Sequence, residues 1–403
     1  MKKPLSGIKV LELADYVSAP VCCRLLADLG AEVIKIERNT GNVWRITGKN
    51  YVPTRFTDEE NPVYDIYNTG KKHITLDLKT EEGMKICKEL LATSDVFVTN
   101  NRLAALKRLG LSYEDIKDEF PRLIYAIGLG YGEKGPSAED PAYDQTAFWA
   151  RNGFLLDMAP LNENYMPVCP PASMGDTVTG LTLMGEICAA LFNRTKTGKG
   201  DYVRSSLYHN GIFAMGTMQI IAQKPFGRVY PRTRAEHSLP NGYYKCKDDQ
   251  YIFIASGYAP QLVPGVFKMI GLGHLIDDER FNSIEARNEN RDEFYQILCD
   301  SFIAKSRDEW INLGKQFDIP VSPMTHFSDI SEDEQAWANG YVQYVSYANG
   351  NTDIIASSPI EMDSVGPLET LPSGGIGHDN DEILSRLGYD EQEIALLKEK
   401  RVI

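Results

Sequence analysis

The sequence predicts an α/β protein with a Rossmann-like large domain and a smaller α+β domain. Two observations support this prediction. Strand patterns alternate with helix patterns over the first half of the chain, which favours a mostly parallel sheet covered by helices. From about residue 226 the pattern changes to a hairpin followed by short helices, which indicates a separate small domain.

The opening segment predicts a strand–helix–strand unit. "IKVLEL" at 8–13 and "AEVIKIE" at 31–37 are apolar strand patterns. The segment between them, "PVCCRLLADLG", predicts a helix that begins at Pro20 and ends at Gly30, because proline suits the first helical turn and glycine suits the end.

The same alternation continues along the chain. A helix is expected over 81–94, and further strands are expected at 73–78, 95–100 and 122–130. "DYVRSSLYHNGIFAMGTMQIIAQ", at 201–223, predicts one more strand followed by one long apolar helix.

The second half predicts a hairpin over 242–257, "GYYKCKDDQYIFIASG", that turns at Asp248 and Asp249. Helices follow up to "RDEWINLGKQF", and the tail over 377–400 is again helical. We therefore expect a large domain over 1–225, a small domain over 226–330, and a C-terminal segment over 331–403 that returns to the large domain.

The composition excludes several classes of function. A formal net charge of -14 argues against a nucleic-acid partner and against an anionic membrane surface. No apolar run approaches the roughly 18 to 20 residues that a membrane span needs. The seven cysteines are dispersed without a CxxC pair, and neither they nor the six histidines have metal-ligand spacing. We expect a cytoplasmic protein without a metal site.

The common cofactor and hydrolase motifs are missing. The turn after the first strand, "ADYVSAP", has no glycine where a dinucleotide fingerprint needs three. "TGKGD" at 197–201 lacks the upstream glycine of a P-loop, and the sequence has no G-x-S-x-G elbow. These tests argue against nicotinamide or flavin binding and against a serine hydrolase.

Basic residues gather near the ends of the first strands, where open α/β sheets bind ligands. Singly, each is explained by an ordinary solvated surface. Together they would supply donors to a phosphorylated, adenine-bearing ligand. They are Arg38, Lys71, Lys72, Arg102, Lys107 and Arg108.

One carboxylate stands at the start of an apolar segment. In "CPPASMGDTVTG" Asp176 lies between a glycine and a threonine and precedes "LTLMGEICAALF". The residue types allow two roles: Asp176 caps the helix that it introduces, or its carboxylate is a nucleophile.

The segments taken together resemble a class III CoA-transferase, in order and over nearly the whole chain. The resembling pieces include "GIKVLELADYVSAPVCCRLLADLGAEVIKIER", "NTGKKHITLDLKTEEG", "DVFVTNNRLAALKRLGLSYEDI", "AYDQTAFWARNG" and "MGDTVTGLTLMGEICAALFNRTKTGKGDYV". "EDEQAWANGY" and "GLGYGEKGP" are similar to the branch that acts on (R)-2-hydroxy acids, such as 2-hydroxyisocaproate and phenyllactate CoA-transferases.

This resemblance implies an interlocked homodimer and makes Asp176 the nucleophile. Carried over to matching positions, it implies that substrate and CoA contacts come from the loops after the strands. These residues are Val17, Ser18, Arg38, Leu76, Lys79, Asn100, Asn101, Arg102, Arg108, Pro141, Ala142, Tyr143 and Asp144.

Two positions depart from other branches of the family. Val17, followed by Ser18, stands where the formyl-CoA transferase branch has a glutamine, which puts an oxalate-specific activity in doubt. Tyr143 stands where the related acyl-CoA racemases have a histidine. Because tyrosine is a poor base near neutral pH, a racemase is disfavoured.

The expected reaction needs no metal and no tightly bound cofactor, because an aspartate of ordinary pKa is ionised at neutral pH and attacks a CoA thioester directly. The substrates would be an acyl-CoA, a 2-enoyl-CoA by analogy, and a small carboxylic acid. The same analogy implies a functional link to a 2-hydroxyacyl-CoA dehydratase in anaerobic amino-acid fermentation. The alternatives are transfer to another acid, such as a carnitine or bile-acid derivative, a racemase, and a CoA-binding protein without activity.

The surroundings of Asp176 carry further expectations. We expect Gly175 to leave room for an approaching acyl group, and backbone N–H groups near Gly175, Gly374 and Gly375 to be candidate oxyanion donors. Candidates for an acyl pocket are Tyr16, Phe148, Trp149 and Met174.

Overall fold

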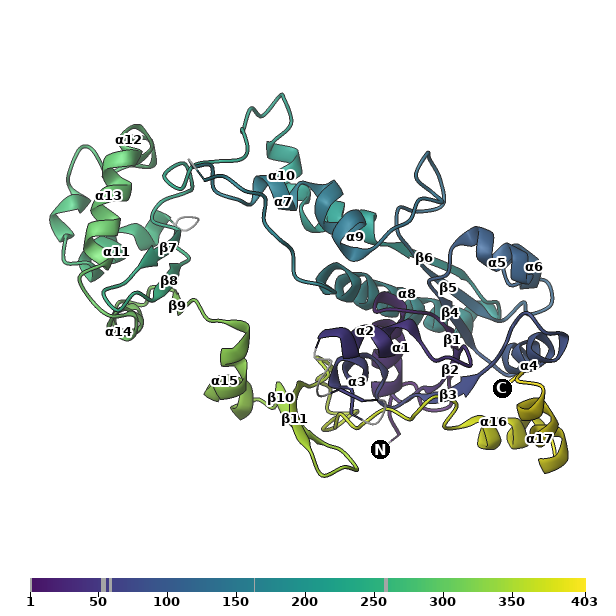
Figure 1. Cartoon of the computed structure of the whole chain (residues 1–403). Coiled ribbons are helices and arrows are strands. Elements are labelled where there is room, and N and C mark those ends of the chain that lie inside the picture. Colours follow the sequence, from purple (N-terminus) through teal and green to yellow (C-terminus); the bar gives the residue numbers. More distant parts are fainter. Residues whose placement is uncertain (1, 52–55, 58–59, 163, 257–259) are drawn as a thin grey trace. The chain divides into compact units, whose positions relative to one another are not determined.

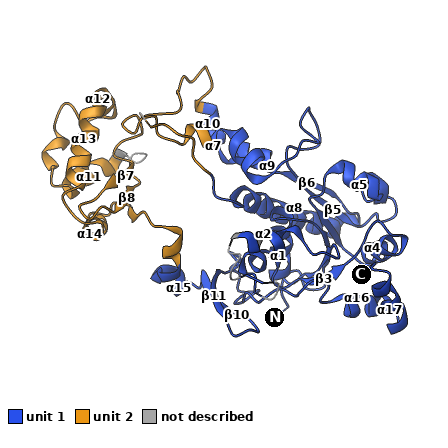
Figure 2. Cartoon of the chain, viewed as in Figure 1, with its two compact units in different colours: residues 1–153, 170–220, 331–403 blue, residues 154–169, 221–330 orange. Residues whose placement is uncertain are grey.

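The computed structural model describes residues 2–51, 56–57, 60–162, 164–256 and 260–403. The chain forms two compact units (Figures 1 and 2). Unit 1 comprises residues 1–153, 170–220 and 331–403, and unit 2 comprises 154–169 and 221–330. Residues 154–169, which the sequence analysis placed in the large domain, belong to unit 2.

Unit 1 is built on a six-stranded sheet of order β3-β2-β1-β4-β5-β6, in which all neighbours are parallel. This order is that of the Rossmann fold, so the predicted fold class of the large domain is confirmed. The strands are β1 (Lys9–Leu13), β2 (Glu32–Glu37), β3 (Lys72–Thr75), β4 (Val96–Thr99), β5 (Ile124–Leu129) and β6 (Tyr202–Ser206).

Successive strand residues point to opposite sides of this sheet, and helices bury both of its faces. On one side Leu11, Phe97 and Tyr125 face a core covered by α4 (Glu81–Ala92), α5 (Leu103–Leu109), α6 (Tyr113–Ile116), α16 (Asn380–Leu387) and α17 (Glu391–Glu399). On the other side Val10 and Val98 face α1 (Ser18–Asp28) and α8 (Met174–Thr197). The unit therefore has three layers, helix on sheet on helix.

Two helix predictions need correction. The first helix, α1, begins at Ser18 rather than Pro20, so Pro20 is its third residue. The long helix expected after β6 is two shorter ones, α9 (Leu207–Ala214) and α10 (Gly216–Ile221). Met215 ends the first with non-helical backbone angles, and Gly216 follows it. Apolar composition alone carries no information about this break.

The remaining elements of unit 1 flank the sheet. They are α2 (Val43–Tyr51), α3 (Pro62–Asn68), a π-helix η1 (Asp144–Trp149), η2 (Ala150–Asn152), α15 (Glu334–Ala338) and an antiparallel pair, β10 (Val342–Ser346) with β11 (Thr352–Ala356). The C-terminal segment is anchored to the sheet edge. Asp379 accepts the His73 N–H at 2.7 Å and Asn380 accepts the Thr75 N–H at 2.9 Å, both on β3.

Unit 2 contains the predicted hairpin, β7 (Gly242–Lys245) with β8 (Tyr251–Ile254), joined by β9 (Val321–Pro323) into an antiparallel sheet. Its turn contains Asp249 at φ 60°, as the sequence predicts, while Gly257 lies outside the described residues. Its helices are α7 (Phe154–Asp157), η3 (Pro260–Leu262), α11 (Val263–Met269), η4 (Gly273–Ile276), α12 (Ile284–Glu289), α13 (Arg291–Phe302), α14 (Arg307–Phe317) and η5 (Phe327–Glu332). Strands β7 and β8 and helices α11, α13 and α14 enclose a core of their own, centred on Phe267, Phe294 and Trp310. Among the described residues, no helix is long and apolar enough to cross a membrane.

Candidate active site

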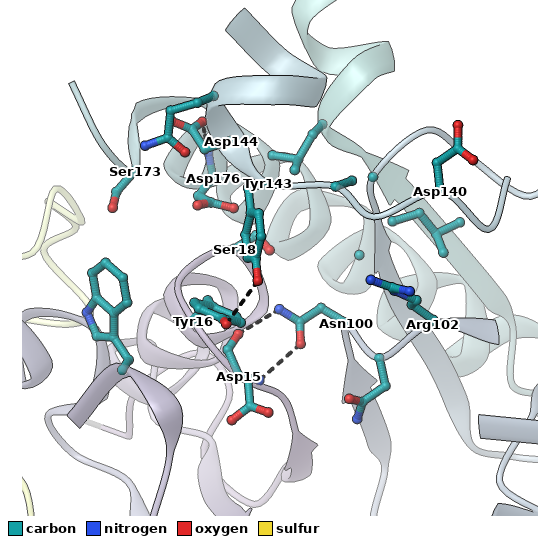
Figure 3. A pocket seen from close by; sticks show the side chains of 18 of the residues that line it. Asp15, Tyr16, Ser18, Asn100, Arg102, Asp140, Tyr143, Asp144, Ser173 and Asp176 are labelled. Carbon is teal, nitrogen blue, oxygen red and sulfur yellow. Dashed lines mark hydrogen bonds between the residues drawn. The ribbon is translucent and has the colours of Figure 1, made fainter. Parts of the chain in front are cut away.

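A cavity of about 380 Å³ opens at the carboxyl edge of the parallel sheet (Figure 3). Its walls come from the loops that follow β1, β4 and β5 and from the first turn of α8. The strand order reverses between β1 and β4, and ligands of open α/β sheets bind at such a switch point. The cavity is therefore where the fold favours a substrate.

Ten of the residues singled out from the sequence line this cavity. They are Tyr16, Ser18, Arg38, Asn100, Asn101, Arg102, Ala142, Tyr143, Asp144 and Asp176. Figure 3 shows Asp144, Ser173 and Asp176 gathered at one end of the cavity and Asp15 with Asn100 at the other.

The other predicted site residues lie elsewhere. Val17 and Phe148 are buried in the core, Trp149 is nearly so, and Met174 and Pro141 are exposed outside the lining. The structure brings none of the glycines Gly175, Gly374 and Gly375 into the lining, and the Gly374 carbonyl accepts a hydrogen bond from Arg45 at 2.9 Å. Leu76, Lys79 and Arg108 line two neighbouring cavities.

Asp176 is the third residue of α8, so the helix-cap alternative is wrong. The N-cap residue is Ser173, which has φ 73° and makes no side-chain cap bond. The Asp176 side chain instead lies beside Ser18, the first residue of α1, which acts to lower the pKa of this carboxyl. Gly180, one turn further along α8, permits this approach, because a Cβ there would lie under 3.0 Å from the Ser18 carbonyl oxygen. The carboxylate thus lies at the N-termini of two helices, which favour negative charge.

The N-terminus of α8 is capped by a residue from another element. The Asp144 carboxylate accepts the Asp176 N–H at 3.1 Å, and its other oxygen accepts the Trp149 Nε1–H at 3.1 Å. A distant carboxylate therefore satisfies an orphan amide of the helix. Asp144 orients the first turn that carries Asp176.

Gly175 is needed for this packing rather than for substrate access. A Cβ at Gly175 would lie under 3.0 Å from the Phe148 ring and from the Asp144 carboxylate. The expectation that this glycine leaves room for an acyl group is therefore wrong: the space beside it is filled by η1.

The pKa of Asp176 also differs from the expectation of an ordinary aspartate. Burial, together with the nearby Asp144 carboxylate, raises the pKa of Asp176 to about 7, against the opposing effect of the Ser18 side chain. Burial also raises the pKa of Asp144. A buried anion beside a second carboxylate is disfavoured, because neither is fully solvated. Such a perturbed carboxylate in a cavity is typical of a functional group.

Two asparagines hold the cavity walls in place. The Asn100 side chain accepts the Asp15 N–H at 3.0 Å and donates to the Asp15 carbonyl at 2.7 Å. Asn101 donates to the Leu13 carbonyl at 3.2 Å. These bonds tie the loop after β4 to the loop after β1. Between them Tyr16 is held at φ 60°, a conformation that a non-glycine residue keeps only where its surroundings enforce it.

Several lining residues were not found from the sequence, among them Asp15, Trp44 and Ser173. Asp15 accepts hydrogen bonds from Arg38 at 3.0 Å and from Asn42 at 2.9 Å. Its position just after the first strand is a signal that we used for basic residues but not for acidic ones. Trp44 and Ser173 have no such signal, because their places depend on how α2 packs and where α8 begins.

Two further cavities continue from the first along the sheet edge. A cavity of about 490 Å³ shares Asp15, Arg38 and Asn101 with it and also contains Leu76 and Lys79. Another, of about 740 Å³, shares Lys79 with the 490 Å³ cavity and contains Arg108. Neither Lys79 nor Arg108 forms an ion pair with another described residue. The row of cavities suits an elongated ligand whose far end is anionic.

Within the described residues, no group of three or more His, Cys, Asp or Glu side chains could hold a metal ion.

The chain matches the model of CoA-transferase family III over residues 5–373. The protein belongs to this family and is a CoA-transferase, an enzyme that uses CoA thioesters as substrates.

Its similarity extends over whole relatives. It is 36% identical over 400 residues to (R)-2-hydroxy-4-methylpentanoate CoA-transferase of Clostridioides difficile, covering 99% of each chain. It is 38% identical to cinnamoyl-CoA:phenyllactate CoA-transferase of Clostridium sporogenes, covering 99% of this chain and 97% of that one. Succinyl-CoA:glutarate CoA-transferase of Homo sapiens is 32% identical, with 100% and 90% covered.

Solved structures agree with this assignment. A CAIB/BAIF family protein from Brucella suis superposes with a TM-score of 0.79 at 28% identity, covering 96% of this chain and 100% of that one. Rv3272 from Mycobacterium tuberculosis gives a TM-score of 0.80 at 26% identity, covering 94% and 99%. The resemblance inferred from the sequence is confirmed.

Proposed function

We propose that this enzyme moves CoA from a 2-enoyl-CoA to an (R)-2-hydroxy acid, such as 2-hydroxyisocaproate or phenyllactate, with Asp176 as the covalent carrier. The observation that carries the proposal is the Asp176 carboxylate in a cavity at the switch point of the sheet. The names of two relatives, at 36% and 38% identity, support the choice of acid, and one of them names an enoyl-CoA donor.

The chemistry proceeds in two halves. The Asp176 carboxylate attacks the thioester carbonyl and the C–S bond breaks. CoA departs as the thiolate, and the acyl group remains on Asp176 as a mixed anhydride. The thiolate attacks the aspartyl carbonyl, which releases the donor acid and leaves an aspartyl-CoA thioester. The acceptor carboxylate attacks this thioester to form a second anhydride. The thiolate then attacks the acceptor's carbonyl and frees Asp176.

The geometry supports each requirement of this route. Burial beside Asp144 raises the pKa of Asp176, and the ionised group is therefore a better nucleophile than an ordinary aspartate, following the trend known for thiolates. The N-termini of α1 and α8 partly offset this cost of ionisation. We place the pantetheine and nucleotide of CoA along the row of cavities. Arg38 then lies midway, and Lys79 with Arg108 lie near the phosphates.

Trapping tests this proposal. Enzyme incubated with an acyl-CoA and treated with hydroxylamine should carry a hydroxamate at Asp176, because anhydrides and thioesters both react with that nucleophile. Mass spectrometry of the peptide that contains Asp176 reports the change. Modification of another residue, or none while product accumulates, would contradict the carrier role.

The pH profile provides a second test. Asp176 must be ionised to attack, and its pKa is about 7, so kcat/KM should fall about tenfold per pH unit below pH 7. Asp144→Asn removes a neighbouring negative charge, which lowers the pKa of Asp176 and should move this decline to lower pH. A profile measured from pH 5 to 9 checks both; a flat wild-type profile down to pH 5 would exclude this titration.

The proposal extends to assembly and context. We infer an interlocked homodimer, as in the resembling family, and large apolar side chains such as Phe213, which is 86% exposed in the single chain, support an interface. Sedimentation that gives the mass of one chain, 45.1 kDa, would refute it. We also propose that the enzyme lies in the cytoplasm and that its product is the substrate of a 2-hydroxyacyl-CoA dehydratase. Deletion of its gene should then stop the dehydration of the 2-hydroxy acid, and unaffected dehydration would refute this link.

A further inference from the structure

Another cavity, of about 470 Å³, also adjoins the one that contains Asp176, and is called the second cavity below. Three residues, Trp44, Ala172 and Ser173, line both cavities. The two spaces are therefore separated by little more than the Trp44 side chain and the residues that precede α8.

The second cavity begins close to the reacting carboxylate. Ser173 is the N-cap residue of α8 and Asp176 is the third residue of the helix. The Ser173 carbonyl accepts the Thr177 N–H at 2.9 Å, so these residues belong to one helical turn. One turn rises about 5 Å. A carbonyl bonded to Asp176 thus lies about the length of a four- or five-carbon side chain from the shared rim.

The lining of the second cavity is uncharged and mostly apolar. Its outer walls are formed by Val63, Ile66 and Tyr67 of α3, and by Ile354 and Ile355 of β11. The cavity around Asp176 is different in kind, since it contains both carboxylates and guanidinium groups. A hydrocarbon group is stabilised in the second cavity, whereas a second carboxylate there would lose its hydration without a partner.

The wall between the cavities is rigid and aromatic. Trp44 donates its Nε1–H to the Val63 carbonyl at 2.9 Å. The centre of its ring lies 6.4 Å from that of the Tyr16 ring and 6.3 Å from that of the Tyr67 ring. Tyr16 in turn shares a hydrogen bond of 3.1 Å with Tyr143. Polar hydroxyls thus face the reacting end, and apolar ring surface continues toward the second cavity.

We propose that this second cavity receives the side chain of the acyl group carried on Asp176, and so selects acids with branched or aromatic side chains over short acids and dicarboxylic acids. The inference rests on the proposed function. It assigns specificity to Trp44, Ile66, Tyr67 and Ile354. Of the acyl-pocket residues expected from the sequence, Tyr16 lines the cavity around Asp176, whereas Phe148, Trp149 and Met174 line neither cavity.

Filling the cavity tests the proposal. Ala356 is an exposed residue of β11 at the rim of this cavity, and Thr352 is an exposed residue of the same strand outside its lining. Ala356→Trp should lower kcat/KM for phenyllactate and 2-hydroxy-4-methylpentanoate at least about tenfold, while lactate stays within about twofold. Thr352→Trp should leave all three values unchanged. Circular dichroism verifies folding.

A second variant acts through charge rather than volume. Ile354 is 39% exposed, so Ile354→Asp should fold, and it should reduce the ratio of phenyllactate to lactate turnover by a similar factor. Equal losses for all acids, or no loss, in folded variants would overturn the side-chain site. Failure of the wild-type enzyme to use any 2-hydroxy acid would overturn the proposed function instead, so the two failures are distinguishable.

Discussion

Asp176→Asn should lower the rate of CoA transfer by at least about 10³-fold, because the amide cannot form the anhydride on which both halves of the reaction depend. The substitution preserves the shape of the side chain. It also removes a carboxylate whose charged form is disfavoured by burial and by Asp144, which together raise its pKa to about 7.

The variant should therefore be at least as stable as the wild type at pH 8. The wild-type group is protonated in both folded and unfolded states below about pH 3, so the stability difference that comes from its charge should disappear there. Steady-state kinetics and thermal unfolding at the two pH values measure these effects.

Glu186→Gln is the matched control for this substitution. Glu186 is another carboxylate of α8, and its pKa is also raised by burial, but it does not line the cavity. The kcat/KM of the Glu186→Gln variant should stay within about twofold of that of the wild type. Equal activity of the two variants would remove Asp176 from the mechanism.

Gly175→Ala should reduce kcat/KM by at least about 10²-fold and destabilise the fold by about 1–3 kcal/mol. The new methyl group would overlap the Phe148 ring and the Asp144 carboxylate, both of which are buried. Relief requires η1 or the first turn of α8 to shift. Either movement breaks the bond from the Asp176 N–H to Asp144 and displaces the Asp176 carboxylate.

Gly185→Ala in the same helix should have the opposite effect on stability. No atom lies within 4 Å of a Cβ at Gly185, and alanine in a helix interior is favoured over glycine by up to about 1 kcal/mol. Activity should be unchanged. Thermal unfolding of both variants checks the pair, and an equally active Gly175→Ala would show that the packing around Gly175 does not position Asp176.

Much of the sheet is predictable because its strands are buried on both faces. Segments such as "DVFVTN" are apolar throughout, and the residues that follow them must lie at one edge when the strands are parallel. That reasoning brings Arg38 and Arg102 to the cavity, and the structure places both there. The ordered motifs add Tyr143 and Asp176, which periodicity does not reveal.

The details around Asp176 are not local properties. Asp144 and Asp176 are 32 positions apart, and their contact depends on how η1 packs against the start of α8. The cap role that the residue type suggested for Asp176 belongs to Ser173 and Asp144, since α8 begins earlier than the pattern indicates. The apolar cavity beside Trp44 combines α3 with β11, which are almost 300 residues apart in the chain.

By itself the sequence determined the α/β class, the strand edge where a ligand is expected and, through ordered motifs, the family and the carboxylate of interest. Only the tertiary structure decided the pKa of that carboxylate, the reason for Gly175 and the place for a substrate side chain. Periodicity and motif order are recorded along the chain. Desolvation, charge proximity and steric overlap depend instead on distances between residues that only folding brings together.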